Sequence, residues 1–168
     1  MGLVVRLAER RDAEAIRALY NGYVTGSTAT FDLVPRTLGE QVDWIDEHSG
    51  GHPAVVALDV DTLGREVLVG FGSLSPFRER PAYSTTVENT VYVDGSRHGE
   101  GIGRRVLEEL MRLAAAHGFH AVIARIAGGN QASIALHRAC GYELVGVERE
   151  VGRKFGRWLD VVEMQRLL

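Results

Sequence analysis

The chain lacks the features of secreted and membrane proteins. Cys140 is its single cysteine, so no intrachain disulfide can form, as is typical of proteins in a reducing compartment. No segment approaches the roughly 20 apolar residues of a membrane span. Charged side chains crowd residues 6–14, where a signal peptide would need an apolar run. We therefore expect a soluble, cytoplasmic protein with no membrane partner.

A basic excess is also absent. Lysine and arginine total 19 against 22 aspartates and glutamates, which gives a net charge of −3. This balance argues against a dedicated nucleic-acid-binding protein, and four prolines are too few for a low-complexity chain. A chain of 168 residues is long enough to bury one hydrophobic core, so we expect a single domain over residues 1–168.

Hydrophobic periodicity predicts an α/β fold. Period-two and continuous apolar runs indicate seven strands, at residues 3–7, 53–60, 67–74, 83–93, 121–126, 142–151 and 158–166. Helical patterns follow Asp12, Thr37 and Gly103, and a short helix is expected over 131–140. The links between the three middle strands are too short for crossover helices, so these strands should pair antiparallel within a mixed sheet.

Local signals refine these elements. Asp12 is expected to cap the first helix, and Thr37 with Glu40 forms a capping box for the second. In the strand 83–93, side chains alternate between two faces, and Glu88 stands in the middle of the strand beside uncharged neighbours. An unpaired carboxylate is unfavourable in such a place unless water or a function accounts for it.

Glycine is abundant, at 20 of 168 residues against a usual ~7%, and it clusters at 99–103 between a strand and a helix. Unpaired N–H groups at a helix N-terminus favour an anion, and glycines let a phosphate approach the backbone. A tight turn without a ligand is the alternative. A Rossmann loop is disfavoured because Val106 stands where its third glycine is needed, and a Walker A loop because Arg104 and Arg105 follow Gly103.

The segment 98–103 resembles the acetyl-CoA loop of the GNAT superfamily of N-acetyltransferases, Gln/Arg-x-x-Gly-x-Gly/Ala. Gly101 and Gly103 match, whereas His98 replaces the usual Gln or Arg. Further segments resemble the branch that acetylates phosphinothricin and methionine sulfoximine, at 20–24, 28–31, 76–83, 86–93, 130–142 and 151–160. The resemblance implies a single-domain GNAT fold, with a mixed central sheet of about seven strands and helices on both faces, and a homodimer.

The resemblance also implies the ligands and their residues. Acetyl-CoA would be the cosubstrate, with no metal, and the acceptor would be the α-amino group of a small amino acid or analogue. The residues implied to hold acetyl-CoA are Val91, Tyr92, Val93, His98, Gly99, Glu100, Gly101, Ile102, Gly103, Arg104, Asn130 and Ser133. Those implied to bind the acceptor are Phe31, Arg78, Arg80, Tyr83 and Thr90. The two arginines suit the α-carboxylate of an amino acid, because a guanidinium can bind a carboxylate through two hydrogen bonds.

The chemistry requires a base, because an amine is protonated at neutral pH and cannot attack a thioester until it loses a proton. The resemblance assigns this role to Glu88 in a direct transfer, and it assigns His137 a part as acid, relay or orienting group. Read without the resemblance, Glu88 is a strand-surface side chain, His137 a packing residue, Asn130 a helix cap, and Arg78 and Arg80 solvated.

Other functions remain open at this point. A thiol enzyme could pair Cys140 with His137, which are i, i+3 neighbours on a helix. A non-catalytic acyl-CoA sensor would keep the glycine loop without a working base, and a GNAT enzyme could act on a different small amine or a peptide amine. Metal binding is not expected, since the histidine pairs at 48/52 and 117/120 straddle glycines.

Overall fold

The computed structural model describes residues 2–168, whose helices and strands follow the predicted order. The strands are β1 (Gly2–Leu7), β2 (Ala54–Val60), β3 (Glu66–Pro76), β4 (Thr86–Val93), β5 (Ala121–Ala127), β6 (Glu143–Lys154) and β7 (Arg157–Leu167). The helices are α1 (Ala13–Gly26), α2 (Leu38–Glu47), α3 (Ile102–Ala116) and α4 (Gln131–Ala139), with short 3-10 turns at Arg10–Asp12, Pro81–Tyr83 and Gly95–Arg97.

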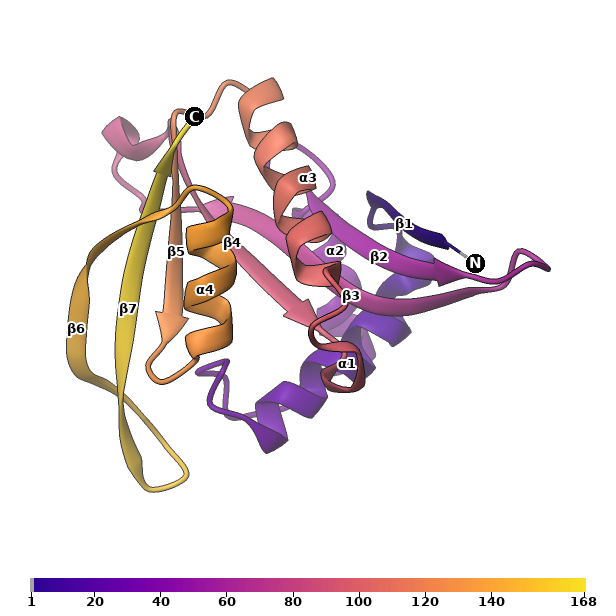
Figure 1. Ribbon diagram of the computed structural model, residues 1–168, viewed down its shortest axis with the longest axis horizontal. Coiled ribbons are helices and arrows are strands. Elements are labelled where there is room, and N and C mark those ends of the chain that lie inside the picture. The colour runs from indigo at the N-terminus through magenta and orange to yellow at the C-terminus, as the bar shows by residue number, and fades with distance from the viewer. Residues whose placement is uncertain (1) are drawn as a thin grey trace.

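All seven strands form one sheet in the order β1-β2-β3-β4-β5-β7-β6. Only the β4–β5 pair is parallel among the strands described, and α3 makes the crossover between these two strands. The mixed seven-stranded sheet of the prediction is therefore confirmed. Helices α1 and α2 lie on one face of the sheet, and α3 and α4 lie on the other (Figure 1).

Each face has its own apolar core. Helix α3 buries Val106, Leu107 and Leu110 against β2 to β5, whereas α1 and α2 enclose Phe71 and Tyr20 on the opposite face. Helix α3 packs this closely because β3 offers it Gly72 instead of a larger residue. A Cβ at that position would lie 2.8 Å from Val106 Cγ1 and 2.6 Å from the Thr90 carbonyl oxygen, so any side chain there would be overpacked.

Strands β4 and β5 separate halfway along their length. Their register runs from Thr86 opposite Ala121 to Asn89 opposite Ala124, and no pairing follows. Beyond this point, β4 continues against β3 and β5 continues against β7. The two strands visibly diverge in Figure 1, with α4 in front of the opening. This wedge is where the site described below is built.

Two local predictions are wrong. The strand predicted from Tyr83 begins at Thr86, because Pro81, which has no N–H to donate and a fixed φ, begins a 3-10 turn that includes Tyr83. Asp12 precedes α1 but does not cap it through its side chain. Its carboxylate instead accepts hydrogen bonds from Arg6 Nη1 and from the Glu9 N–H, both at 2.8 Å, and these outcompete the cap. The Thr37–Glu40 capping box of α2 is confirmed.

Candidate active site

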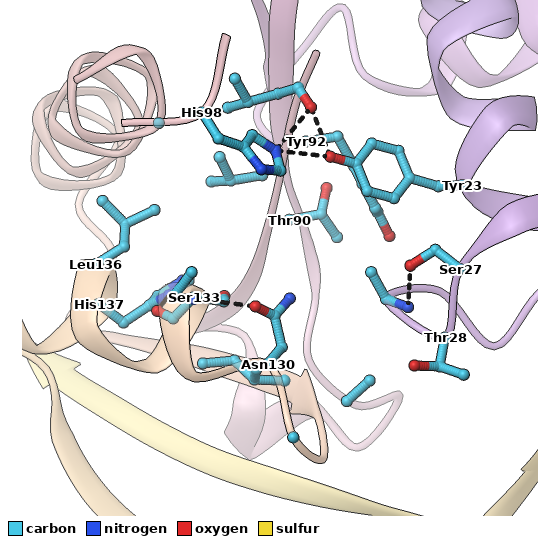
Figure 2. A pocket seen from close by; sticks show the side chains of 18 of the residues that line it. Tyr23, Ser27, Thr28, Thr90, Tyr92, His98, Asn130, Ser133, Leu136 and His137 are labelled. Carbon is cyan, nitrogen blue, oxygen red and sulfur yellow. Dashed lines mark hydrogen bonds between the residues drawn. The ribbon is translucent and has the colours of Figure 1, made fainter. Parts of the chain in front are cut away.

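A cavity of about 850 Å³, here called the splay cavity, opens between the diverging halves of β4 and β5. Its walls come from six places: the end of α1 with residues 27–29, β4, the loop 98–104, β5 with the turn that follows it, α4, and the start of β7 at Arg157. Figure 2 shows the side chains of α4 on one side of this cavity and Ser27 and Thr28 on the other. Residues distant in sequence therefore converge on one elongated hollow.

The glycine loop forms the phosphate-sized end of the splay cavity. Gly99 and Gly101 have φ of +86° and +80°, a left-handed conformation that glycine adopts without strain. Gly101 is the N-cap of α3, so the first N–H groups of a 15-residue helix open toward this loop. Gly103 lines the cavity, and a Cβ there would lie 3.1 Å from Leu136 Cδ2. The loop has the geometry of an anion site.

Not every residue of the loop contributes a side chain to the cavity. Ile102 is 2% exposed and belongs to the core under β3, while Glu100 pairs with Arg97 at 2.7 Å. These two side chains are absent from the cavity lining, so only their backbone groups are available to a ligand there. Arg104 does line the cavity, although its Nε donates to Glu108 at 2.8 Å.

His98 closes the loop against the end of α1. Its Nε2 lies 3.2 Å from the Tyr23 hydroxyl and 3.3 Å from the Val93 carbonyl, and the Tyr23 hydroxyl donates to that same carbonyl (Figure 2). Tyr23 was not among the predicted site residues, yet it lines the splay cavity. His98 thus ties the loop to β4 and α1 where the superfamily pattern has Gln or Arg.

Helix α4 brings Asn130, Ser133 and His137 to the opposite wall. Asn130 Oδ1 accepts from the Ser133 N–H at 3.1 Å, so Asn130 is a helix cap as well as a cavity residue. His137 is 3% exposed. Its Nδ1 lies 2.8 Å from the Ser133 carbonyl oxygen and its Nε2 lies 3.0 Å from Asn89 Nδ2. Because a carbonyl can only accept, Nδ1 carries the proton and Nε2 accepts from Asn89.

A buried network therefore holds His137 neutral. The Tyr142 hydroxyl donates to Asn89 Oδ1 at 2.9 Å, which turns the amide nitrogen of Asn89 toward His137. Burial lowers the pKa of His137, since the charged imidazolium would be poorly solvated there. The polar side-chain atoms of Asn89, His137 and Tyr142 in this network all have hydrogen-bond partners, as buried polar groups usually do.

Glu88 lies on the other face of β4. Neighbouring residues of a strand point to opposite sides of the sheet, and Asn89 points to His137. Glu88 therefore faces away from His137 and lines a second cavity of about 340 Å³, here called the Glu88 cavity, with Phe77, Arg78, Arg125, Glu148 and Glu163. The expected pairing of Glu88 with His137 as a proton relay has no direct contact to support it.

The surroundings of Glu88 favour a proton on its carboxylate. Burial raises the pKa of Glu88, and the negative charges of Glu163 and Glu148 add to this rise, while Arg125 opposes it. No hydrogen bond or ion pair of residues 2–168 reaches the Glu88 carboxylate. A half-buried, unpartnered carboxylate with a raised pKa is the state that a general base needs.

Of the five predicted acceptor residues, Arg78 and Thr90 line a cavity, each a different one, whereas Phe31, Arg80 and Tyr83 line neither. Arg78 lines the Glu88 cavity, and its guanidinium lies over the rings of Phe77, at 4.8 Å, and Tyr83, at 5.6 Å. Thr90 and Tyr92 line the splay cavity. Arg80 is exposed and lines neither cavity, and Tyr83 contributes by supporting Arg78. No carboxylate of the described chain lies within ion-pair distance of Arg78.

Phe31 is positioned by the hairpin β6–β7. Its ring lies against Gly152, where an added Cβ would overlap the ring. The neighbouring Thr30 carbonyl accepts a hydrogen bond from Lys154 Nζ at 2.9 Å, and Lys154 is 4% exposed. The loop between α1 and α2 is thus fastened to β6. Sequence reasoning missed Lys154, because nothing local indicates that β6 reaches this loop.

Arg125 is the other residue that sequence reasoning did not assign. It lines both cavities, and its Nη2 donates to Glu148 at 2.7 Å. The available signal was a charge inside a strand that is otherwise apolar. Cys140, in contrast, is buried and lines neither cavity, and burial raises the pKa of its thiol. This placement does not favour a thiol nucleophile.

Residues 2–168 contain no group of three or more His, Cys, Asp and Glu side chains that could hold a metal ion. The same residues include no helix that is both long enough and apolar enough to cross a membrane.

Comparisons with known proteins agree with this geometry. Residues 5–162 match the family model described as an acetyltransferase (GNAT) domain. The chain is 40% identical to the phosphinothricin N-acetyltransferase of Streptomyces coelicolor, over 98% of this chain and 95% of that protein. It is 39% identical to the L-methionine sulfoximine/L-methionine sulfone acetyltransferase of Pseudomonas paraeruginosa, over 98% and 94%.

A solved structure extends the likeness to three dimensions. The GNAT superfamily phosphinothricin acetyltransferase of Sinorhizobium meliloti, crystallised with acetyl-CoA, superposes with a TM-score of 0.92 at 38% identity, covering 100% of this chain and 89% of that one. With the glycine loop, the wedge between β4 and β5 and these relatives taken together, the chain belongs to the GNAT family of N-acetyltransferases.

Proposed function

We propose that this enzyme transfers the acetyl group of acetyl-CoA to the α-amino group of a small amino-acid-like acceptor of the phosphinothricin, methionine sulfoximine or methionine sulfone type. The observation that carries the proposal is the Glu88 cavity, where a carboxylate and the free guanidinium of Arg78 share one hollow. An amino acid offers an ammonium to the first and a carboxylate to the second. The names of the relatives support the same acceptor class.

The lining of the splay cavity suits the chemistry of acetyl-CoA. The backbone amides of 99–103, with Arg104, would hold its pyrophosphate, and the free edge of β4 at Val91, Tyr92 and Val93 would meet the pantetheine arm. Asn130 and Ser133 would flank that arm from α4. When bound, acetyl-CoA would supply a thioester: the acceptor nitrogen bonds to its carbonyl carbon, the carbon–sulfur bond breaks, and CoA leaves as a thiolate that takes up a proton.

In this proposal Glu88 takes the proton from the acceptor ammonium, directly or through a water. Its raised pKa suits a base that must hold and release a proton near neutral pH. His137 serves the other face: with Asn89 and Tyr142 it fixes the wall between α4 and β4, and its neutral form avoids a buried charge beside the thioester.

The acceptor class is tested by measuring CoA release with a thiol reagent. The panel contains phosphinothricin, methionine sulfoximine, methionine sulfone, a polyamine and an alanine-initiated peptide, each at saturating acetyl-CoA. We expect turnover with the first three. Turnover with the peptide or polyamine alone would assign a different amine, and acetyl-CoA binding without turnover of any amine would indicate a sensor.

Direct transfer is tested separately. We expect initial-velocity lines that intersect when both substrates are varied, and no mass increase of the enzyme after incubation with acetyl-CoA alone. An acetylated enzyme would overturn the proposal. Cys140→Ala, which removes the single thiol from the core without adding volume, should leave activity intact, because that side chain lies outside both cavities.

We further propose that the chain forms a homodimer. Large apolar side chains are exposed along the outer hairpin of the sheet, at Leu144, Val145, Val147, Val151, Phe155 and Trp158. Concentrated apolar exposure on an edge strand usually indicates a protein contact. Light scattering coupled to size exclusion should give twice the chain mass, and a monomer at micromolar concentration would contradict this.

A further inference from the structure

We propose that Arg125 is a positioning residue of the acceptor site, one that keeps the Glu88 carboxylate charged and available as a base. This inference rests on the proposed role of Glu88. Its starting point is a single observation: among the residues described, Arg125 is the one that lines both the splay cavity and the Glu88 cavity. It therefore stands at the junction where acceptor and thioester would meet.

The register of the sheet fixes this position. Arg125 follows Ala124, the last residue of β5 that pairs with β4. Glu88 pairs with Ile123, and residues two apart share a face, so the side chains of Arg125 and Glu88 lie on the same side of the sheet. Arg125 is thus the first side chain beyond the point of separation, directed to the face that carries the base.

Two more carboxylates share that face. Glu163 of β7 stands directly opposite Arg125 in the antiparallel register, and Glu148 of β6 accepts from Arg125 Nη2 at 2.7 Å. Three carboxylates therefore surround one guanidinium. Since Glu148 occupies a single nitrogen, the planar fork of Arg125 keeps other N–H groups for Glu88 or for a water between them.

The remaining groups around Glu88 do not replace this cation. Arg78 lines the same cavity, but its guanidinium is held over the rings of Phe77 and Tyr83, and Arg125 is the cation that lowers the pKa of Glu88. On the β3 side Glu88 faces Ser75, whose hydroxyl lies 2.9 Å from His48 Nε2. Burial lowers the pKa of His48, so this imidazole is neutral at the pH where the enzyme would work.

The consequence for pH dependence follows with a definite sign. Arg125 holds the pKa of Glu88 below the value that burial, Glu148 and Glu163 would otherwise give it. Loss of Arg125 should raise that pKa, so that the acid limb of kcat/KM moves to higher pH. Loss of the Glu148 charge should do the opposite, because a repelling carboxylate disappears and Arg125 is released toward Glu88.

The experiment is a set of kcat/KM profiles between pH 5 and 9 for the wild type, Arg125→Met, Arg125→Lys and Glu148→Gln. In Arg125→Met we expect the midpoint of the acid limb to lie about 0.5 to 1 pH unit higher than in the wild type. This is the size of the effect of a nearby charge that is reduced by partial exposure to solvent. In Arg125→Lys the midpoint should lie between those of the wild type and Arg125→Met. In Glu148→Gln it should move to lower pH. Arg112→Met, which breaks an exposed ion pair on α3, is the matched control and should not move the limb.

The outcomes separate the inference from the proposal beneath it. Glu88→Gln must first remove the acid limb, and a limb that survives this change refutes Glu88 as the base. If the limb belongs to Glu88 but stays in place in Arg125→Met, or moves upward in Glu148→Gln, then the role given to Arg125 is wrong. Should Arg125→Met fail to fold, Arg125→Gln removes the same charge with a polar side chain, and its acid limb decides the sign.

Discussion

The two cavities beside β4 are lined by different kinds of chemical group. Where β4 faces α3 and α4, the splay cavity is lined mainly by the glycine loop with its backbone N–H groups and by the neutral Asn89–His137 pair. On the other face, the Glu88 cavity is made of charged side chains. A site built from backbone is sensitive to added side-chain volume, whereas a site built from charges is sensitive to their removal. Each prediction below tests one side of this contrast.

The largest effect is expected from Glu88→Gln. The amide has nearly the same shape but cannot take a proton, so kcat should fall by about 10²- to 10⁴-fold, the usual contribution of a general base. The dissociation constant of acetyl-CoA should not change, because Glu88 lies on the other face of β4 from the glycine loop. Stopped-flow turnover and calorimetric titration measure the two quantities, and wild-type turnover would exclude Glu88 as the base.

The converse pattern is expected from Gly103→Val. Its side chain would enter the wall of the splay cavity, where a Cβ alone lies 3.1 Å from Leu136. Where the added side chain occupies space that the ligand would use, a steric cost of about 1–3 kcal/mol, the size of an overpacking penalty, weakens acetyl-CoA binding about 5- to 150-fold. At saturating acetyl-CoA, kcat should stay near the wild-type value.

The matched control is Gly51→Val, since no atom lies within 4 Å of a Cβ at that loop position. It should bind acetyl-CoA as the wild type does. If Gly103→Val lowered kcat as strongly as it weakened binding, the two faces would not be separable in the way the geometry indicates.

The same contrast explains what the sequence alone could predict. The glycine loop is contiguous, so its five residues reveal both its conformation and its anion chemistry. The Glu88 cavity draws its charges from positions 78, 88, 125, 148 and 163. These meet because β7 is inserted between β5 and β6, a sheet order that no local pattern reports. Alternation along β4 did identify Glu88, but the significance of Arg125 depends on that order.

Secondary structure was predictable for similar reasons, and its two errors have a common cause. The Thr37–Glu40 capping box lies within one turn of chain and formed as expected. Asp12 had the right position for a cap, but its carboxylate accepts two hydrogen bonds from Arg6 of β1 instead. Tyr83 had the composition of a strand, but Pro81 bent the chain two residues before it. Tertiary or neighbouring constraints outweighed a correct local preference in both places.

A smaller effect concerns the neutral network of the splay cavity. Because the pKa of His137 is lowered in the folded state, the unfolded chain binds more protons at mildly acid pH. The stabilisation is present above the unfolded pKa of about 6.5 and is lost as the pH falls through the folded value. Urea unfolding at pH 7 and pH 5.5 should show a loss of unfolding free energy that is smaller by about 1 kcal/mol in His137→Gln than in the wild type.

The control for this measurement is the exposed His120→Gln, which should keep the pH dependence of the wild type. His48 contributes in the same direction and Glu88, with its raised pKa, in the opposite one. The informative quantity is therefore the difference in unfolding free energy between the wild type and His137→Gln at each pH. Equal pH dependence in the wild type and His137→Gln would show that the network does not keep this histidine neutral.

The smallest effect is expected from Arg104→Ala, the one charged side chain predicted for the pyrophosphate. Its guanidinium is exposed and already bonded to Glu108 at 2.8 Å, so its charge is partly neutralised and screened. If the backbone supplies most of the binding, acetyl-CoA affinity should fall by no more than about fivefold, or ~1 kcal/mol. Titration of acetyl-CoA at 50 and 300 mM salt checks this, and the small difference between wild type and variant should shrink at high salt. A loss larger than that of Gly103→Val would reverse the ranking and make the splay cavity, like the Glu88 cavity, a site held by side-chain charge.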